Sequence, residues 1–75
     1  MPFVLYVRAD CHLCTLAKEV LHQCEVVAKT ESLDGNAWLE TNYGTRIPVL
    51  TETNSGRELD WPFDAWTLRR FLDPT

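Results

Sequence analysis

Apolar residues near the start of the chain change from a continuous run to a helical pattern. Residues 3–7 (Phe-Val-Leu-Tyr-Val) form an unbroken apolar run, which is typical of a strand covered on both faces. From residue 13 to residue 24 the apolar positions recur three and four apart, which predicts a helix with one buried face. The residues of that predicted face are Leu13, Leu16, Ala17, Val20, Leu21 and Cys24. Asp10 precedes the pattern and is expected to cap the helix.

Two shorter patterns follow in the middle of the chain. Residues 25–30 contain a Val-Val-Ala run and are predicted to form the second strand. A short helix is expected from about residue 36 to residue 42, with Trp38 and Leu39 turned inward. Gly44 follows this helix and suits the left-handed position that ends many helices.

The next apolar run begins a predicted hairpin. Residues 47–51 are expected to form the third strand, and a proline near its start is tolerated there. Turn residues at 54–57 lead to a fourth strand at 58–61, so the two strands should pair in antiparallel fashion.

The final helix carries start and stop signals. Asp64 is its expected N-cap, and Phe63 and Leu68 should pack together as a hydrophobic staple. Trp66 is expected to fill the core, although with Trp61 it could instead form an exposed aromatic platform. Pro74 should end the helix.

The predicted element order is therefore β-α-β-α-β-β-α. This order indicates an α/β fold with a four-stranded mixed sheet and three helices, whose first β-α-β unit is parallel and right-handed. We expect a single domain over residues 1–75, because a chain of this length supports only one small core.

Composition and charge narrow the classes of partner. The formal net charge is −4 and there is no stripe of Lys and Arg, which argues against nucleic acid as the main partner. No apolar run approaches the ~20 residues of a membrane-spanning helix, so no membrane association is expected. The first residues show neither a basic region nor a cleavage site, so we expect no signal peptide, a cytoplasmic location and a monomer.

Two cysteines mark the junction between the first strand and the first helix. Cys11 and Cys14 are separated by two residues, so they would lie about one helical turn apart. A helix N-terminus carries unpaired N–H groups and partial positive charge, and a thiol placed there ionises more easily than a free thiol. In a reducing compartment this spacing indicates redox or metal chemistry rather than a structural cross-link. Cys24 lies on the predicted buried stripe and is expected to be a core residue.

Metal binding is the alternative for the cysteine pair. A zinc site needs about four ligands, and the two histidines, His12 and His22, do not complete one within a single chain. Two copies of the chain could share a metal cluster through four thiolates, and an inert cysteine pair is a third alternative.

The element order and the cysteine pair together resemble the thioredoxin fold in its small glutaredoxin form. Arg8, three residues before Cys11, stands where glutaredoxins usually have a lysine near the attacking thiol. Residues 43–48 (Tyr-Gly-Thr-Arg-Ile-Pro) look like the segment that leads into the cis-proline of that fold. Residues 10–14 and 58–64 look like a small group of bacterial glutaredoxin-like proteins, and the resemblance covers essentially the whole chain.

The resemblance implies roles for individual residues. Cys11 would be the nucleophile and Cys14 the resolving thiol. Pro48 would follow a cis peptide bond, and Ile47 would offer its backbone N–H and C=O to an extended substrate. Asp64 could take the acidic role that grips the γ-glutamyl end of glutathione in typical glutaredoxins, or it could be only a helix cap.

Two departures from the glutaredoxin pattern stand out. Trp61-Pro62 replaces the usual pair of glycines, which adds bulk, removes a backbone donor and weighs against glutathione binding. His12-Leu13 replaces the usual Pro-Tyr pair between the cysteines.

Four charged or ionisable side chains have open roles at the site. His12, when protonated, could stabilise the thiolate of Cys11, or it could simply be solvated. Asp10 disfavours the thiolate, whereas Arg8 favours it. Arg46 could attract an anionic substrate into the groove or lie on the surface.

These features predict a thiol–disulfide oxidoreductase that reduces protein or glutathione mixed disulfides. It would hold no bound cofactor, and glutathione or a thioredoxin-type reductase would supply the electrons. The expected substrate-binding residues are Arg8, His12, Arg46, Ile47, Pro48, Trp61 and Asp64. The alternative is a non-catalytic binding module of the same fold, which holds a protein partner or the shared cluster.

Overall fold

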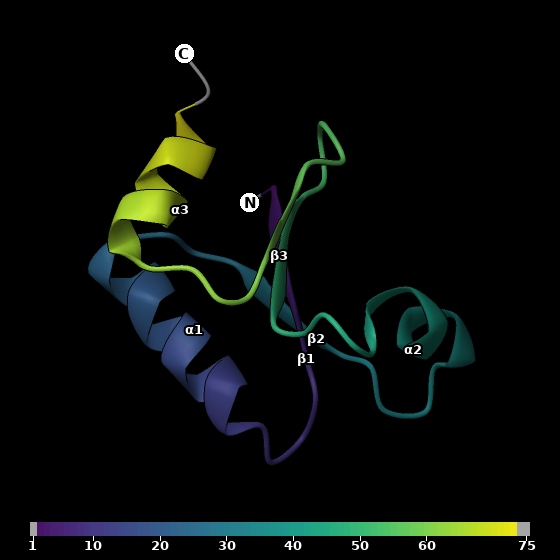
Figure 1. The fold of residues 1–75 in the computed structure, drawn as a ribbon. Helices are drawn as coiled ribbons and strands as arrows, with labels where there is room; N and C mark the ends of the chain where they lie inside the picture. The colour runs from purple at the N-terminus through teal and green to yellow at the C-terminus, as the bar shows by residue number, and fades with distance from the viewer. Residues whose placement is uncertain (1, 74–75) are drawn as a thin grey trace.

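The computed structural model describes residues 2–73, and the order of its elements is the predicted one (Figure 1). In chain order the elements are β1 (Phe3–Val7), α1 (His12–Gln23), β2 (Lys29–Ser32), α2 (Ala37–Tyr43), β3 (Val49–Glu52), β4 (Glu58–Asp60) and α3 (Ala65–Leu72). The α/β class, with its mixed four-stranded sheet, is confirmed. Pro74, the expected stop of the last helix, lies outside the described residues.

The start of β3 and the end of β1 lie at the same end of the sheet. Its strand order is β2-β1-β3-β4, with β1 and β2 parallel as predicted for the first β-α-β unit. β1 and β3 run antiparallel, and β3 and β4 form the predicted antiparallel hairpin. The chain therefore leaves β1, enters β3 and leaves β4 at one end of the sheet.

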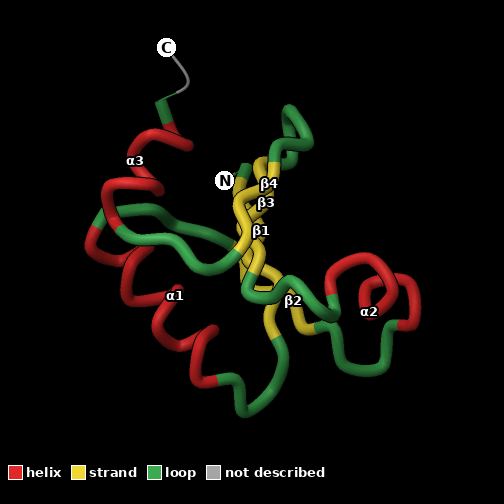
Figure 2. The backbone as a smooth tube through the Cα atoms, viewed as in Figure 1, coloured by secondary structure: helices red, strands yellow, loops and turns green. Residues whose placement is uncertain are grey.

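The helices cover both faces of the sheet. Figure 2 shows α1 and α3 on one side of the strands and α2 on the other. Because side chains alternate along a strand, neighbouring residues of β1 and β3 serve opposite faces. The larger core cluster, under α1 and α3, contains Leu5, Val7, Cys14, Ala17, Leu21, Leu50, Phe63 and Leu68. The smaller one, under α2, contains Leu33, Leu39, Tyr43 and Val49, with Tyr6 packed against it.

The prediction for the second strand was wrong by four residues at its start. β2 begins at Lys29 rather than at residue 25. Glu25 takes a positive φ of 59°, its N–H donates to His22 C=O, and Val26 N–H donates to Leu21 C=O. These two bonds form a Schellman motif that ends α1 and directs residues 26–28 across to the sheet. β2 is an edge strand with mostly exposed side chains, so hydrophobicity could not locate it.

The start and the buried face of α1 also differ from the prediction. Cys11, rather than Asp10, is the N-cap, and Asp10 is exposed with a positive φ of 56°. The buried face is turned relative to the predicted stripe, because Cys14 is buried and Leu13 is 45% exposed.

Three expectations for α2 and α3 were also wrong. Trp38 and Trp66 are 65% and 64% exposed, so neither fills the core. Gly44 is right-handed, with a φ of −55°. A Cβ atom at Gly44 would lie 2.5 Å from the carbonyl oxygen of Glu40, so close approach rather than a left-handed turn requires a glycine there.

The helices remain short throughout. Within residues 2–73 none of them combines the length and the apolar character needed to cross a membrane.

Candidate functional site

The two cysteines of the first turn of α1 form an asymmetric pair. Their sulfur atoms lie at disulfide distance, and their Cα atoms are 5.2 Å apart. Cys11 is the N-cap, and its Sγ accepts a hydrogen bond of 3.1 Å from the backbone N–H of Cys14. Cys14 is 3% exposed and belongs to the larger core cluster, whereas Cys11 is only half-buried. The outer cysteine is thus the one that a partner can reach.

A cleft of about 620 Å³ opens beside the cysteine pair. The end of β1, the loop after it, the first turns of α1 and the end of β2 form its walls. Its lining residues are Val7, Arg8, Ala9, Asp10, Cys11, His12, Cys14, Thr15, Lys18 and Ser32. Of the predicted substrate-binding residues within the described chain, Arg8 and His12 line this cleft, while Arg46, Ile47, Pro48, Trp61 and Asp64 do not.

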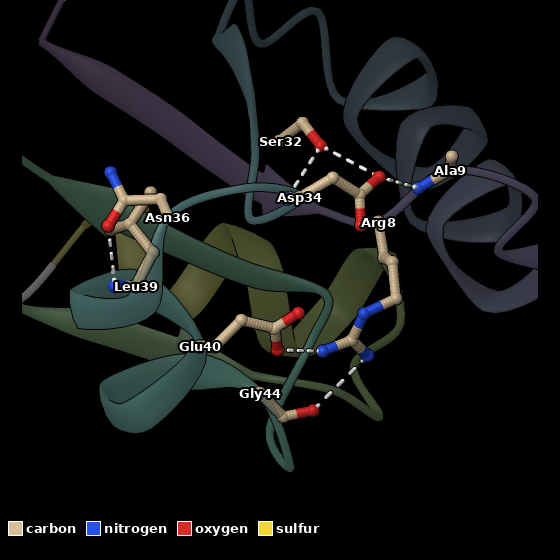
Figure 3. Close-up of polar contacts among 8 residues, drawn as sticks. All are labelled: Arg8, Ala9, Ser32, Asp34, Asn36, Leu39, Glu40 and Gly44. Carbon is tan, nitrogen blue, oxygen red and sulfur yellow. Dashed lines mark hydrogen bonds and ion pairs between the residues drawn. The ribbon is translucent and has the colours of Figure 1, made fainter.

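The loop that carries Cys11 is tied to the opposite side of the cleft. The backbone N–H of Ala9 donates to Asp34 Oδ2 over 3.1 Å, and the Ser32 hydroxyl donates to the same oxygen (Figure 3). Nothing in the sequence pattern singled out Asp34 or Ser32, since their partner is a backbone group 25 residues away from Asp34. These contacts fix the path of the chain into α1.

The side chain of Arg8 is held by α2. Its guanidinium forms an ion pair with Glu40 and donates to the carbonyl of Gly44 over 3.4 Å, as Figure 3 shows. Glu40 was not among the predicted site residues. Because a carboxylate of the chain itself neutralises Arg8, this arginine does not act as a free cation beside the thiol.

The Pro48 segment is joined to the turn after β4. The Ile47–Pro48 and Trp61–Pro62 peptide bonds are both cis. The N–H of Trp61 donates to the carbonyl of Pro48 over 3.1 Å, and the N–H of Ile47 donates to the carbonyl of Tyr43 over 3.1 Å. The N–H of Ile47, which was expected to bind an extended substrate, is thus bonded within the chain, and the substrate role of Ile47 stays a prediction.

Arg46 is bound to β4 rather than directed into the cleft. Its guanidinium donates to Asp60 over 2.9 and 3.0 Å and to Glu58 over 2.5 Å. Hydrogen bonds to these carboxylates raise the pKa of Arg46, and the same contact lowers the pKa of Asp60. Tyr43 lies beneath the guanidinium and donates its hydroxyl to Glu58; burial and this bond raise the pKa of Tyr43.

Asp64 has the capping role that the sequence predicted. Its Oδ1 accepts the backbone N–H of Thr67 over 2.8 Å, and this bond lowers the pKa of Asp64. Phe63 and Leu68 are both buried in the larger core cluster, which agrees with the predicted staple. Trp61 packs against that cluster and meets the Phe63 ring edge-on at 5.0 Å.

His12 and Cys24 lie at opposite ends of α1, so the two do not join in one metal site. His12 is exposed at the start of α1. Cys24 is half-buried against the core, with its Sγ 3.6 Å from the carbonyl oxygen of Ala65. In the part of the chain that the structure describes, no group of three or more His, Cys, Asp or Glu side chains is placed to hold a metal ion. A cluster shared between two chains stays a prediction.

Comparison with known proteins links this site to a family. Residues 3–73 match the family model described as Glutaredoxin-like domain (DUF836). The X-ray structure of protein XcR50 from X. campestris is similar over 97% of both chains, with 50% identity and a TM-score of 0.91. The solution structure of protein Ne2328 from Nitrosomonas europaea is 27% identical with a TM-score of 0.69, over 92% of this chain and 87% of that one. The comparison with curated proteins gave no match.

Proposed function

The chain belongs to the glutaredoxin-like domain family, and on that premise we propose that it is a thiol–disulfide oxidoreductase acting through Cys11 and Cys14. The observation that carries the proposal is the asymmetry of the pair. One sulfur is accessible at a helix N-terminus, and the other is buried one turn away at disulfide distance.

Cys11 is the attacking residue in this proposal. A helix N-terminus favours a thiolate, because backbone N–H groups and the helix dipole interact with the negative charge. The hydrogen bond from Cys14 N–H to Cys11 Sγ supports this assignment. Cys14 is buried, so it reacts only with a sulfur that is already attached to Cys11.

The reaction is a pair of thiol–disulfide exchanges. The thiolate of Cys11 attacks one sulfur of the substrate disulfide; a Cys11–substrate bond forms, the substrate S–S bond breaks, and the leaving thiolate takes a proton from water. The thiolate of Cys14 then attacks Cys11 Sγ, which releases the second substrate thiolate and closes the Cys11–Cys14 disulfide. Two electrons and two protons pass to the substrate. An external dithiol, or two equivalents of a monothiol such as glutathione, returns them.

The Pro48 segment is proposed as one wall of the substrate path. Ile47 packs against the core cluster that contains Cys14, and its N–H is occupied within the chain. A substrate strand lying there would donate an N–H to the carbonyl of Ile47, with no second backbone bond in return. We place this activity in a reducing compartment such as the cytoplasm, where dithiol forms persist.

A coupled assay tests the proposal. In a C24S background, where only the paired cysteines remain, the protein at catalytic concentration should accelerate reduction of a protein disulfide by dithiothreitol. Titration against reduced and oxidised dithiothreitol should show one two-electron transition of Cys11 and Cys14. The same assay with glutathione as donor tests whether it serves as the reductant.

The matched control is C11S/C24S, which keeps the buried thiol but lacks the attacking one. Acceleration by C24S and none by C11S/C24S is the expected result. If C24S is no faster than C11S/C24S, the oxidoreductase proposal fails and the non-catalytic binding module takes its place.

A further inference from the structure

Arg8 and Arg46 lie at the end of the sheet where β1 and β4 finish, and carboxylates of the chain neutralise both of them. Arg8 is paired with Glu40, and Arg46 is paired with Glu58 and Asp60. The two pairs lie at one end of the sheet, since Arg8 follows β1 directly and Asp60 ends β4. A substrate carboxylate would compete with an internal one for either guanidinium.

Arg8, Lys18 and Asp10 line the cleft beside the cysteines, and the charged groups at this end of the sheet as a whole include more carboxylates than cations. The cations are Arg8, Lys18 and Arg46. The carboxylates are Asp10, Asp34, Glu40, Glu58 and Asp60. Asp34 accepts from the loop that carries Cys11, and Asp10 lines the cleft itself. The field at this end therefore repels anionic molecules.

Between the cysteines, an exposed apolar side chain, Leu13, follows the exposed His12. Leu13 is 45% exposed, next to the half-buried Cys11. An exposed leucine there offers contact to a polypeptide side chain near the disulfide, a contact that a small acidic thiol does not need.

We propose that the Cys11–Cys14 site selects neutral or basic polypeptide disulfides and discriminates against acidic ones, glutathione included. The inference rests on the proposed oxidoreductase function and adds its substrate class. Glu40, Glu58 and Asp60 act as specificity-determining residues in it, because they neutralise the arginines that would otherwise attract an acidic substrate.

Two matched peptides test this selectivity. Each carries one cysteine joined to the same aromatic thiol, flanked by two lysines in one peptide and by two glutamates in the other. Reduced C24S protein attacks the peptide sulfur and releases the aromatic thiol, whose absorbance gives the second-order rate. Each rate is divided by the rate with dithiothreitol, which removes the intrinsic difference in reactivity.

The lysine peptide should react about fivefold faster than the glutamate peptide at about 0.01 M ionic strength. At about 1 M salt, where charges are screened beyond about 3 Å, the two rates should agree within about twofold. A normalised glutamate-peptide rate equal to or above the lysine-peptide rate at low salt would overturn the inference while leaving the oxidoreductase intact.

Charge-neutralising variants locate the effect. E40Q and the double variant E58Q/D60N each free an arginine from its carboxylate partner. Each should lower the ratio of the lysine-peptide rate to the glutamate-peptide rate about two- to threefold at low salt. E52Q is the matched control: Glu52 also faces an arginine, Arg57 at 3.5 Å, but it lies at the opposite end of the sheet. Equal effects of E40Q, E58Q/D60N and E52Q on that ratio would show that the position of the carboxylate does not matter. That result would overturn the specificity role of Glu40, Glu58 and Asp60.

The two hypotheses fail in different ways. If neither peptide reacts faster with C24S than with C11S/C24S, the proposed function is overturned and the selectivity with it. If both react at a rate that depends on Cys11 but not on peptide charge, only the selectivity is overturned.

Discussion

The starts of α1 and α3 share an extended N-cap residue but have different capping atoms. Cys11 and Asp64 are both extended N-cap residues, and each accepts a hydrogen bond from the N–H three residues on. The donor–acceptor distance is 3.1 Å to the sulfur and 2.8 Å to the carboxylate oxygen. Sulfur is a weak acceptor, so α1 begins with a poorer cap than α3. The position that stabilises α3 is used in α1 to hold a reactive atom.

The two helix starts are also supported differently. The turn into α3 is held from inside, because Phe63 and Leu68 are buried in the core and Trp61 packs on Phe63. The loop into α1 is held from outside, by the bonds of Arg8 to Glu40 and of Ala9 to Asp34. External polar contacts leave the sulfur accessible, whereas a hydrophobic staple would cover it.

The largest expected effect separates the two caps by their role in catalysis. C11S should lower the rate of disulfide reduction to the uncatalysed background. Serine has no sulfur to form a mixed disulfide, and its hydroxyl does not ionise at neutral pH. D64N should keep turnover within about twofold, since asparagine caps as well as aspartate. The coupled assay with a protein disulfide measures both. A loss of activity in D64N, with its helix content unchanged by circular dichroism, would give Asp64 a substrate role.

The second effect concerns the internal support of α3. L68A should lower the free energy of unfolding by about 2–5 kcal/mol, because it leaves a cavity at a fully buried position. L13A, in the first turn of α1, should cost much less, about 0.5 kcal/mol, because Leu13 is 45% exposed and lies outside the buried core. Urea titration of both variants, with the disulfide reduced, provides the comparison. A cost for L13A near that of L68A would contradict the observed orientation of α1.

The third effect concerns the weak cap of α1. In a C14S/C24S background, which excludes the disulfide, serine at position 11 should give a more stable protein than alanine by about 1 kcal/mol. The reason is that the serine oxygen accepts the N–H of residue 14, as Cys11 Sγ does, and alanine does not. Urea unfolding of the two triple variants measures this difference. Equal stabilities would show that the N-cap contact is not formed in solution.

The smallest effect is the pH dependence of the α3 cap. The hydrogen bond from Thr67 lowers the pKa of Asp64 below its ordinary value of 3.8. The stability that this carboxylate contributes is therefore present above the unfolded pKa and is lost as the pH falls through the folded one. The asparagine side chain in the D64N variant does not titrate. On acidification from pH about 5 to about 3, the wild type should therefore lose more free energy of unfolding than D64N does. A difference that stays constant with pH would contradict the cap.

Local signals in the sequence located the elements that have strong periodicity or caps. β1, the hairpin of β3 and β4, and the Asp64 cap of α3 follow from apolar runs, turn residues and a capping side chain. The cysteine pair at the β1–α1 junction also follows from position alone. These features depend on neighbours a few residues away.

The features that could not be predicted depend on tertiary contacts. β2 is an edge strand whose pairing with β1, not its hydrophobicity, defines it. The partner of Arg8 is Glu40, 32 residues along the chain, so the sequence suggested a free cation where the structure has an ion pair. Trp38 and Trp66 are exposed, whereas Leu39 and Leu68 of the same helices are buried in the core clusters, and the sequence pattern alone does not distinguish them.

The most direct test of the account compares the two thiols one at a time. C14S/C24S leaves only Cys11, and C11S/C24S leaves only Cys14. The rate of mixed-disulfide formation with a small aromatic disulfide is measured for each at neutral pH. Cys11 should react at least about tenfold faster, because it lies accessible at a helix N-terminus while Cys14 is buried. Equal rates, or a faster Cys14, would contradict the claim that α1 is built to present Cys11 as the nucleophile.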